Sequence, residues 1–263
     1  MIVDQPFSLT MPDQDAPELT IDRLFSGKLV CLQHRDGYRF SVDAVLLAHF
    51  AQPRAGEKVL DLCAGCGVIS LILKYRQPQL ALAAFELQPK LAELIRKNVE
   101  TNGFQDSFTV IEGDCNRMRE YVTAGSFDRV VCNPPYRKAQ SGRVNPTEEE
   151  ARARHEVRVE LSAVLSAIRY ALKTRGRADL VYPARRAAGL LAAMKAADLE
   201  PKKIQVVYSY PDSEGKLVLV EAVKGGGEEL AVLPPFYLYT EPHGACTPEM
   251  AALYQPLVKG SSV

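Results

Sequence analysis

The chain has 263 residues, of which 47% are hydrophobic and 24% are charged, and its 32 basic residues balance 32 acidic ones. This composition excludes a disordered or low-complexity chain, and its zero net charge predicts no overall basic field for nucleic acid. We expect a cytoplasmic protein, because the sequence shows neither a bilayer-length apolar run nor a secretory signal. Only Cys63 and Cys66 have CxxC spacing, and without further ligands they predict no metal site.

The N-terminal part predicts a loose arm, a hairpin and a helix. Residues 1–22 carry five acidic residues and no basic one, so we expect an acidic flexible arm. The stretch LVCLQHRDGYRF (29–40) predicts a hairpin around an Asp36-Gly37 turn. FSVDAVLLAHFA (40–51) predicts a helix capped by Ser41. Residues 23–54 are therefore expected to pack as a hairpin and helix on the core.

From Lys58 onward, strand and helix patterns alternate. Apolar runs predict strands at 58–63, 80–87, 108–114, 127–133 and 178–183, with helices at 68–76, 89–103, 115–124, 148–173 and 184–197. Two further runs, 203–211 and 217–225, predict a closing hairpin. The fold class is therefore α/β: a Rossmann-like, doubly wound, mostly parallel seven-stranded sheet with an antiparallel edge hairpin. It should occupy residues 55–225, followed by a C-terminal extension over 226–263.

Small and acidic residues stand at the ends of three consecutive strands. LDLCAGCG ends the first strand and opens a helix, Glu86 ends the second strand, and Asp114 ends the third. The carboxyl ends of parallel strands share one edge, where ligands bind in such sheets. The loop lacks the spacing of dinucleotide and nucleotide-phosphate sites, and an acidic rim suits a cofactor with a positive centre and an adenosine. The simpler alternative is a tight turn with ordinary strand-end carboxylates.

The segment Asn133-Pro134-Pro135-Tyr136 follows the fourth strand. An amino group on a base or an amide is a poor nucleophile, because its lone pair is delocalised. The Asn133 side-chain oxygen and the Pro134 carbonyl are suited to accept its two N–H bonds and to aim the lone pair at a methyl donor. Pro135 has no N–H to occupy that carbonyl, and Tyr136 can stack on a flat group. These four residues predict in-line methyl transfer, while the alternative is a rigid turn that only ends a strand.

The strand ends resemble the first motifs of class I S-adenosylmethionine methyltransferases, although that family usually has Gly where Cys63 stands. We expect the loop to keep its shape with this small residue. The resemblance implies S-adenosylmethionine as cofactor and S-adenosylhomocysteine as product. Gly65 and Gly67 would border the methionine part, Glu86 would bind ribose, and Asp114 would lie by adenine. The implied cofactor-binding residues are Asp61, Cys63, Gly65, Gly67, Glu86, Leu87, Asp114, Cys115 and Asn133.

The NPPY segment resembles the catalytic segments of N6-adenine methyltransferases and of protein-glutamine N5-methyltransferases. Together with FSVDAVLLAHF, FELQPKLAELIRKN and VLVEAVKGG, it makes residues 22–258 similar to the tRNA adenine N6-methyltransferases that act on adenine 37 of a valine tRNA. The resemblance implies a tRNA partner and methylation of N6 of an adenine near the anticodon. Tyr136 would stack on that adenine, and the substrate-binding loop would include Arg137, Lys138 and Arg143.

Several questions stay open at this point. Outer candidates for phosphate contacts are Arg175, Arg177, Arg185, Arg186, Lys202 and Lys203. The alternatives are a glutamine N5-methyltransferase acting on protein, another N-methyltransferase of a small or DNA substrate, and a non-catalytic cofactor-binding module. The near-neutral charge counts against RNA. The short segment before the cofactor domain counts against the glutamine enzymes, which usually have a substantial helical domain there.

Overall fold

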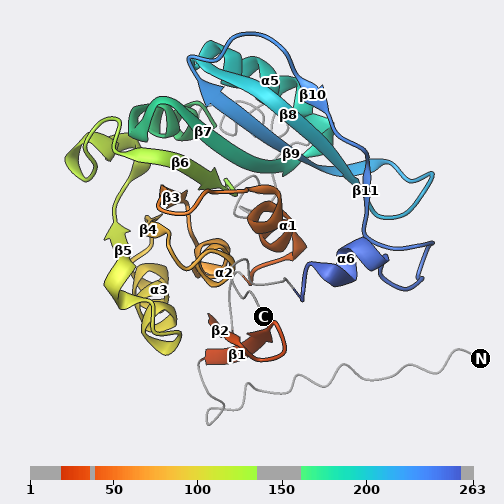
Figure 1. Cartoon of the computed structure of the whole chain (residues 1–263), viewed down its shortest axis with the longest axis horizontal. Coiled ribbons are helices and arrows are strands. Elements are labelled where there is room, and N and C mark those ends of the chain that lie inside the picture. The colour runs from red at the N-terminus through yellow and green to blue at the C-terminus, as the bar shows by residue number, and fades with distance from the viewer. Residues whose placement is uncertain (1–18, 36–38, 135–160, 256–263) are drawn as a thin grey trace, which may run out of the picture.

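A mixed β-sheet runs through the middle of the protein (Figure 1). The computed structural model describes residues 19–35, 39–134 and 161–255. Within these ranges the sheet has nine strands in the order β10-β8-β9-β7-β6-β3-β4-β5, and β11 pairs with β8. The seven long strands are the predicted sheet, and the fold class is confirmed.

The parallel half of the sheet follows the predicted alternation closely. Its strands are β3 (Lys58–Leu62), β4 (Ala81–Glu86), β5 (Phe108–Glu112) and β6 (Phe127–Cys132). The connections contain α2 (Val68–Arg76), α3 (Pro89–Thr101) and the 3₁₀ turns η1 (Gln105–Ser107) and η2 (Cys115–Glu120). Because all four strands are parallel, their carboxyl ends open onto one edge.

The other half begins with the long strand β7 (Leu172–Pro183), which pairs parallel with β6. Residues 161–171 are helical and directly precede it. The turn η3 (Ala184–Arg186) and helix α5 (Ala187–Ala196) lead to the predicted hairpin of β8 (Leu199–Tyr208) and β9 (Gly215–Lys224). β9 lies between β7 and β8 and is antiparallel to both. The C-terminal extension adds β10 (Ala231–Val232), β11 (Phe236–Tyr237) and α6 (Pro248–Ala252).

Both faces of the sheet are covered, because successive strand residues point to opposite sides. Val59 and Val131 pack with α1 (Val42–Phe50), α2 and α3 in one hydrophobic cluster. Their neighbours Leu60 and Val130 belong to a second cluster with the helix at 161–171 and α5. Strands buried on both faces explain the nearly continuous apolar runs in the sequence.

The N-terminal hairpin differs from the prediction. β1 (Leu19–Leu24) pairs antiparallel with β2 (Leu29–His34), and the turn lies between them rather than at Asp36-Gly37. Residues 19–22, expected in the loose arm, therefore belong to a strand. The residues after the predicted turn do not return along β2, because the Phe40 N–H donates to Gln33 Oε1 at 2.8 Å where the chain turns into α1. The acidic residues of 1–22, of which only Asp22 lies in β1, led to the prediction of an arm.

Candidate active site

The loop between β3 and α2 is shaped by three residues in the left-handed backbone region. The φ angles of Cys63, Gly65 and Gly67 are +62°, +59° and +81°. The Ala64 N–H donates to the Phe85 carbonyl at 3.1 Å, which joins the loop to β4. A Cβ on Gly65 would meet no atom within 4 Å, whereas one on Gly67 would lie 3.1 Å from Ile95 Cγ2. The loop therefore has open space beside Gly65 and close helix packing at Gly67.

Glu86 ends β4 and holds the loop in place. Its Oε2 accepts a hydrogen bond from the Gly65 N–H at 2.8 Å, and its Oε1 accepts one from the Gln88 N–H at 2.9 Å. A carboxylate has about four acceptor positions, so this buried side chain keeps capacity for further donors. The next residue, Leu87, is 62% exposed, which makes it an apolar side chain at the rim of the same edge.

Asp61 is fully buried on β3, two residues before Cys63, where the loop begins. Its Oδ2 accepts hydrogen bonds from Ser70 Oγ at 2.9 Å and from the Ser70 N–H at 3.2 Å. Its Oδ1 is buried and has no hydrogen-bond partner within the described ranges. Burial raises the pKa of Asp61 to about 7, against the opposing effect of the Ser70 hydrogen bonds. This carboxyl is thus costly to keep ionised and has one open oxygen.

Asp114 and Cys115 follow β5 at the third strand end. Asp114 caps η2, since its Oδ1 accepts hydrogen bonds from the backbone N–H and the side-chain amide of Asn116, both at 2.9 Å. Cys115 is half-buried, and desolvation raises the pKa of its thiol to about 11. A Cβ on the preceding Gly113 would lie 2.9 Å from the rings of Phe85 and Tyr121, so the chain must pass close to them. Asp114 and Cys115 thus lie at the carboxyl edge of the sheet, as predicted.

Asn133 leaves the sheet directly beside the loop. β6 pairs with β3 in the register Leu62 to Cys132, so the next residue of β6 is level with Cys63. The Oδ1 atom of Asn133 is buried and receives no hydrogen bond from any described residue. Pro134 is buried as well. The other predicted catalytic and substrate-binding residues, Pro135, Tyr136, Arg137, Lys138 and Arg143, lie outside the described residues.

Two asparagines, Asn98 in α3 and Asn102 directly after it, support the loop and were missed from the sequence. Asn98 is fully buried, and its Nδ2 donates to the Cys66 carbonyl of the loop at 2.9 Å and to the Leu32 carbonyl at 3.0 Å. Asn102 exchanges two hydrogen bonds with the backbone of Val30. The N-terminal hairpin is therefore joined to the loop between β3 and α2 through Asn98 of α3. The available signal was an asparagine four residues after Leu94 on the apolar helix face.

The six outer basic candidates do not form one surface. Arg185 and Arg186 lie in η3, immediately after the carboxyl end of β7 and hence at the edge of the site. The others, Arg175, Arg177, Lys202 and Lys203, lie in the first halves of β7 and β8, toward the opposite edge. In the part of the chain that the structure describes, no cluster of His, Cys, Asp or Glu is arranged to hold a metal ion. No helix there has the length and apolar character needed to cross a membrane.

The sheet order, together with the loop and the polar side chains at the strand ends, defines an α/β methyltransferase fold. A crystal structure described as a predicted O-methyltransferase from Agrobacterium tumefaciens superposes with a TM-score of 0.67 at 21% identity, covering 81% of this chain and 95% of that one. The model of the methyltransferase small domain matches residues 41–155. These likenesses define the class.

Curated relatives give the particular family. The chain is 30% identical over 189 residues to the tRNA1(Val) (adenine(37)-N6)-methyltransferase of Porphyromonas gingivalis, covering 70% of this chain and 73% of the relative. It is 30% identical over 150 residues to the enzyme of that name from Shewanella loihica, covering 56% of this chain and 60% of the relative. The chain belongs to the family of tRNA1(Val) (adenine(37)-N6)-methyltransferases. Its match spans about three fifths of the Shewanella relative's length.

Proposed function

We propose that this chain transfers a methyl group from S-adenosylmethionine to N6 of adenine 37 in a valine tRNA, as the names of its relatives state for them. The observation that carries the proposal is the buried, unpaired Oδ1 of Asn133 among the described residues. A buried acceptor without a donor costs about 1–3 kcal/mol, so its retention needs a reason. An amino group delivered by a substrate is a suitable donor.

The residues at the carboxyl edge fit S-adenosylmethionine. Open space lies beside Gly65, Glu86 has acceptor capacity for ribose hydroxyls, and exposed Leu87 offers an apolar surface to the adenine ring. The open Oδ1 of Asp61 is an acceptor below the loop, where an ammonium group can be recognised. Asp114 is placed for the adenine end. The bound cofactor supplies an electrophilic methyl group on a positively charged sulfur.

Asn133 then orients the nucleophile. Its Oδ1 accepts one N–H of the adenine amino group, and the Pro134 carbonyl accepts the other, which draws the nitrogen lone pair out of the ring plane. The amino nitrogen gains a fourth bond on methyl transfer and becomes strongly acidic, so a proton leaves to water without a dedicated base. Catalysis rests on positioning and on fixed dipoles aimed at developing charge. Tyr136 is the expected stacking platform for the splayed base.

The test is a label-transfer experiment with a defined acceptor. The protein is incubated with methyl-labelled cofactor and, in separate reactions, valine tRNA transcript, the same transcript with guanine at position 37, a DNA duplex, and a glutamine-containing protein substrate. Label in N6-methyladenine of the first transcript alone is expected. Label on glutamine with none in RNA would overturn the proposal, and equal label in both transcripts would move the target away from adenine 37.

A further inference from the structure

A basic groove lies on the half of the sheet that the methyl-transfer site does not use. It has a volume of about 380 Å³, and its lining includes four basic side chains and one acidic one: Arg175, Arg177, Lys202, Lys203 and Glu221. Among the described residues, those that line it include no aromatic ring. A groove with this lining suits an anion that presents several negative charges and suits a stacked base poorly.

Two irregularities of the backbone bring these side chains together. β8 shifts its register against β9 between Pro201 and Lys203, so the consecutive residues Lys202 and Lys203 can both line the groove. β7 shifts against β6 between Leu172 and Arg177, and within this bulge Arg175 has a left-handed φ of +64°. A non-glycine residue in that region is strained. Bulges re-aim side chains, and here both do so toward one place.

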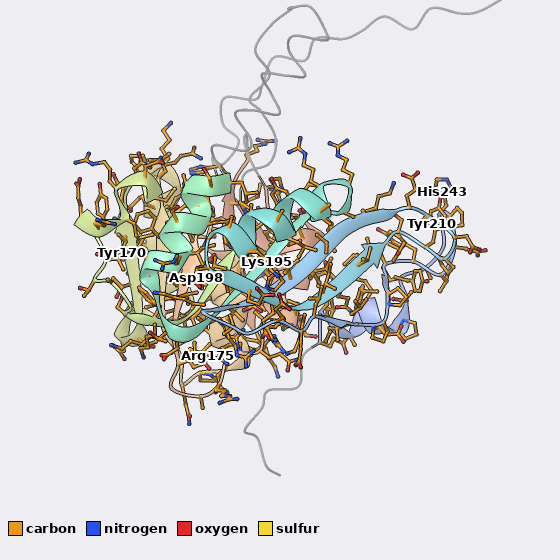
Figure 2. The ribbon with its side chains drawn as sticks, turned by 90° about the horizontal axis from the view of Figure 1, so that it is seen from above. Tyr170, Arg175, Lys195, Asp198, Tyr210 and His243 are labelled. Atoms are coloured by element: carbon orange, nitrogen blue, oxygen red, sulfur yellow. The ribbon has the colours of Figure 1, made fainter. Side chains whose placement is uncertain are left out.

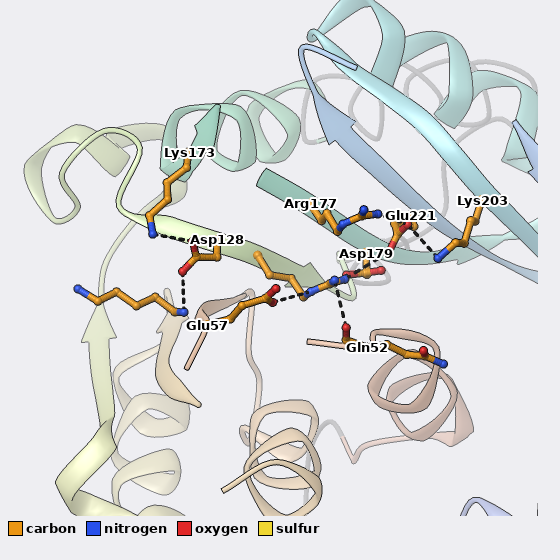
Figure 3. A network of polar contacts seen from close by, with 10 residues as sticks. Gln52, Glu57, Asp128, Lys173, Arg177, Asp179, Lys203 and Glu221 are labelled. Atoms are coloured by element: carbon orange, nitrogen blue, oxygen red, sulfur yellow. Dashed lines mark hydrogen bonds and ion pairs between the residues drawn. The ribbon is translucent and has the colours of Figure 1, made fainter. Parts of the chain in front are cut away.

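The charges of the groove are only partly neutralised. Arg177 Nη1 and Lys203 Nζ lie 2.6 Å and 3.2 Å from Glu221 Oε1, and Figure 3 shows both side chains converging on this carboxylate. The other oxygen of Glu221 is 3.5 Å from the buried Arg129 guanidinium, so one carboxylate serves three cations. It cannot neutralise all of them.

The remaining two cations bind only backbone carbonyls. Arg175 Nη1 donates to the Gly225 carbonyl at 3.0 Å, and Lys202 Nζ donates to the carbonyls of Gly227 and Glu228 at 3.2 Å and 2.8 Å. Neither has a carboxylate partner among the residues that the structure describes. Carbonyl contacts fix the direction of a cation and leave its charge intact, so the groove keeps a net positive charge.

The groove is remote from the candidate active site. From Arg177 to the carboxyl end of β7 at Pro183 the strand advances by six residues, or ~20 Å. Figure 2 shows Arg175 well apart from Tyr210, which follows β8 on the carboxyl side of the sheet. A ligand that touches both places must be long and negatively charged along its length.

We infer that this groove is a second RNA-binding site, which takes backbone phosphates of the substrate away from the methylated base. The inference rests on the proposed function, because it names how the same RNA is held. The neutral total charge of the chain agrees with a local site rather than a basic field. Phosphate contacts of this kind add affinity and register and carry no base specificity.

The test compares RNA binding and methylation by matched double variants of the full chain. Arg175→Gln/Lys202→Gln removes the two cations that hold no carboxylate, so no buried acid is left unpaired. Lys28→Gln/Lys97→Gln removes two exposed lysines elsewhere. Losing two phosphate contacts should weaken RNA binding about tenfold and should reduce the slope of log K against log salt by ~1.5–2. The control should change neither, and cofactor affinity and saturated rate should stay unchanged in both.

A charge-conserving variant separates charge from folding. Arg175→Lys/Lys202→Arg should keep the salt slope, and thermal unfolding of each variant shows whether it is folded. If wild-type protein methylates adenine 37 while the groove variant keeps the wild-type affinity and salt slope, the inference is wrong and the proposed function stands. If RNA binding depends on the groove while no RNA is methylated, the proposed function fails and the groove stands. Loss of slope in the charge-conserving variant as well would overturn the electrostatic assignment.

Discussion

At the carboxyl edge of the sheet, the buried oxygens Asn133 Oδ1 and Asp61 Oδ1 receive no hydrogen bond from the described residues. Across β6, β7 and β9, by contrast, buried charges pair with opposite charges, and there only the second oxygen of Asp179 lacks a hydrogen-bond partner among the described residues. Arg129, 3% exposed, contacts Asp179 through Nη1 and lies 3.3 Å from Glu57. It also reaches Glu221. In the first region buried acceptors lack a protein donor among the described residues, and in the second buried ion pairs join neighbouring strands.

This difference predicts how each region responds to substitution. Removing one member of a buried ion pair leaves an uncompensated charge, so the cost falls on stability. Removing an acceptor that has no partner takes away a group that was already destabilising, so the cost falls on ligand binding or on the reaction. Single substitutions at four positions break or sharpen the comparison.

The largest effect is expected from Arg129→Met. Asp179 would then be buried without its cation, while Glu221 keeps Arg177 and Lys203. The free energy of unfolding should fall by about 3–5 kcal/mol. Chemical denaturation at pH 7 measures this loss. The double variant Arg129→Met/Asp179→Leu removes the main pair together and should recover a part of it. A loss below about 1 kcal/mol in the single variant would show that the network contributes no more than surface charges do.

Asn133→Ala should lower the rate of methyl transfer and leave stability nearly unchanged. Stability should change little, because the removed oxygen has no donor to lose among the described residues. The rate of methyl transfer should fall by about 10²–10³, as for other preorganised polar groups at a reacting centre. Single-turnover rates measure this, with cofactor affinity by calorimetry as the control. A near-normal rate with saturating RNA would contradict the role given to the side-chain oxygen.

Asp61→Asn tests an open acceptor that can also titrate. The folded-state pKa of about 7 lies above the usual 3.8, so the folded protein binds this proton more tightly than the unfolded chain. Its stabilising contribution is complete below pH ~4 and is lost as the pH rises through ~7, by up to ~1.4 kcal/mol per pH unit. The variant should flatten this part of the stability profile and unfold at higher denaturant concentration at pH 8.

The same variant should bind S-adenosylmethionine more weakly. The Asn amide can still accept the two Ser70 hydrogen bonds with its oxygen, but it presents N–H donors where Asp61 presents Oδ1. Calorimetric titration at pH 8 measures the affinity. Unchanged affinity together with a flattened pH profile would make Asp61 a purely structural residue of β3.

The parallel half of the sheet was predictable because local signals and tertiary structure agree there. The apolar runs 80–87 and 127–133 correspond to β4 and β6, which end at Glu86 and at Cys132, so the runs alone located the strand ends to within one residue. The hairpin at 29–40 was wrong because Asp36-Gly37 is a strong turn signal while the true partner strand, β1, is rich in polar residues. Local turn chemistry was overridden by pairing that only the fold determines.

The ion pairs across β6, β7 and β9 could not be predicted from local sequence patterns. Arg129 and Asp179 are fifty residues apart, and their pairing depends on the register of β6 with β7, which no local pattern encodes. The groove depends on two bulges, and a bulge changes which side chains share a face without changing composition. The basic residues were therefore recognised as candidates, but their division between two edges of the sheet was not.

The smallest effect is expected at Cys63, where a left-handed backbone conformation affects both the stability of the chain and the shape of the loop. Its φ of +62° is the reason that a glycine is usual at this position of the loop. Glycine should be more stable than alanine here by about 1 kcal/mol, the reverse of their order in an ordinary strand or helix. Thermal unfolding of Cys63→Gly and Cys63→Ala measures the difference. If alanine were the more stable, the loop would not hold this conformation in solution, and the backbone beside Gly65 would not keep its described shape.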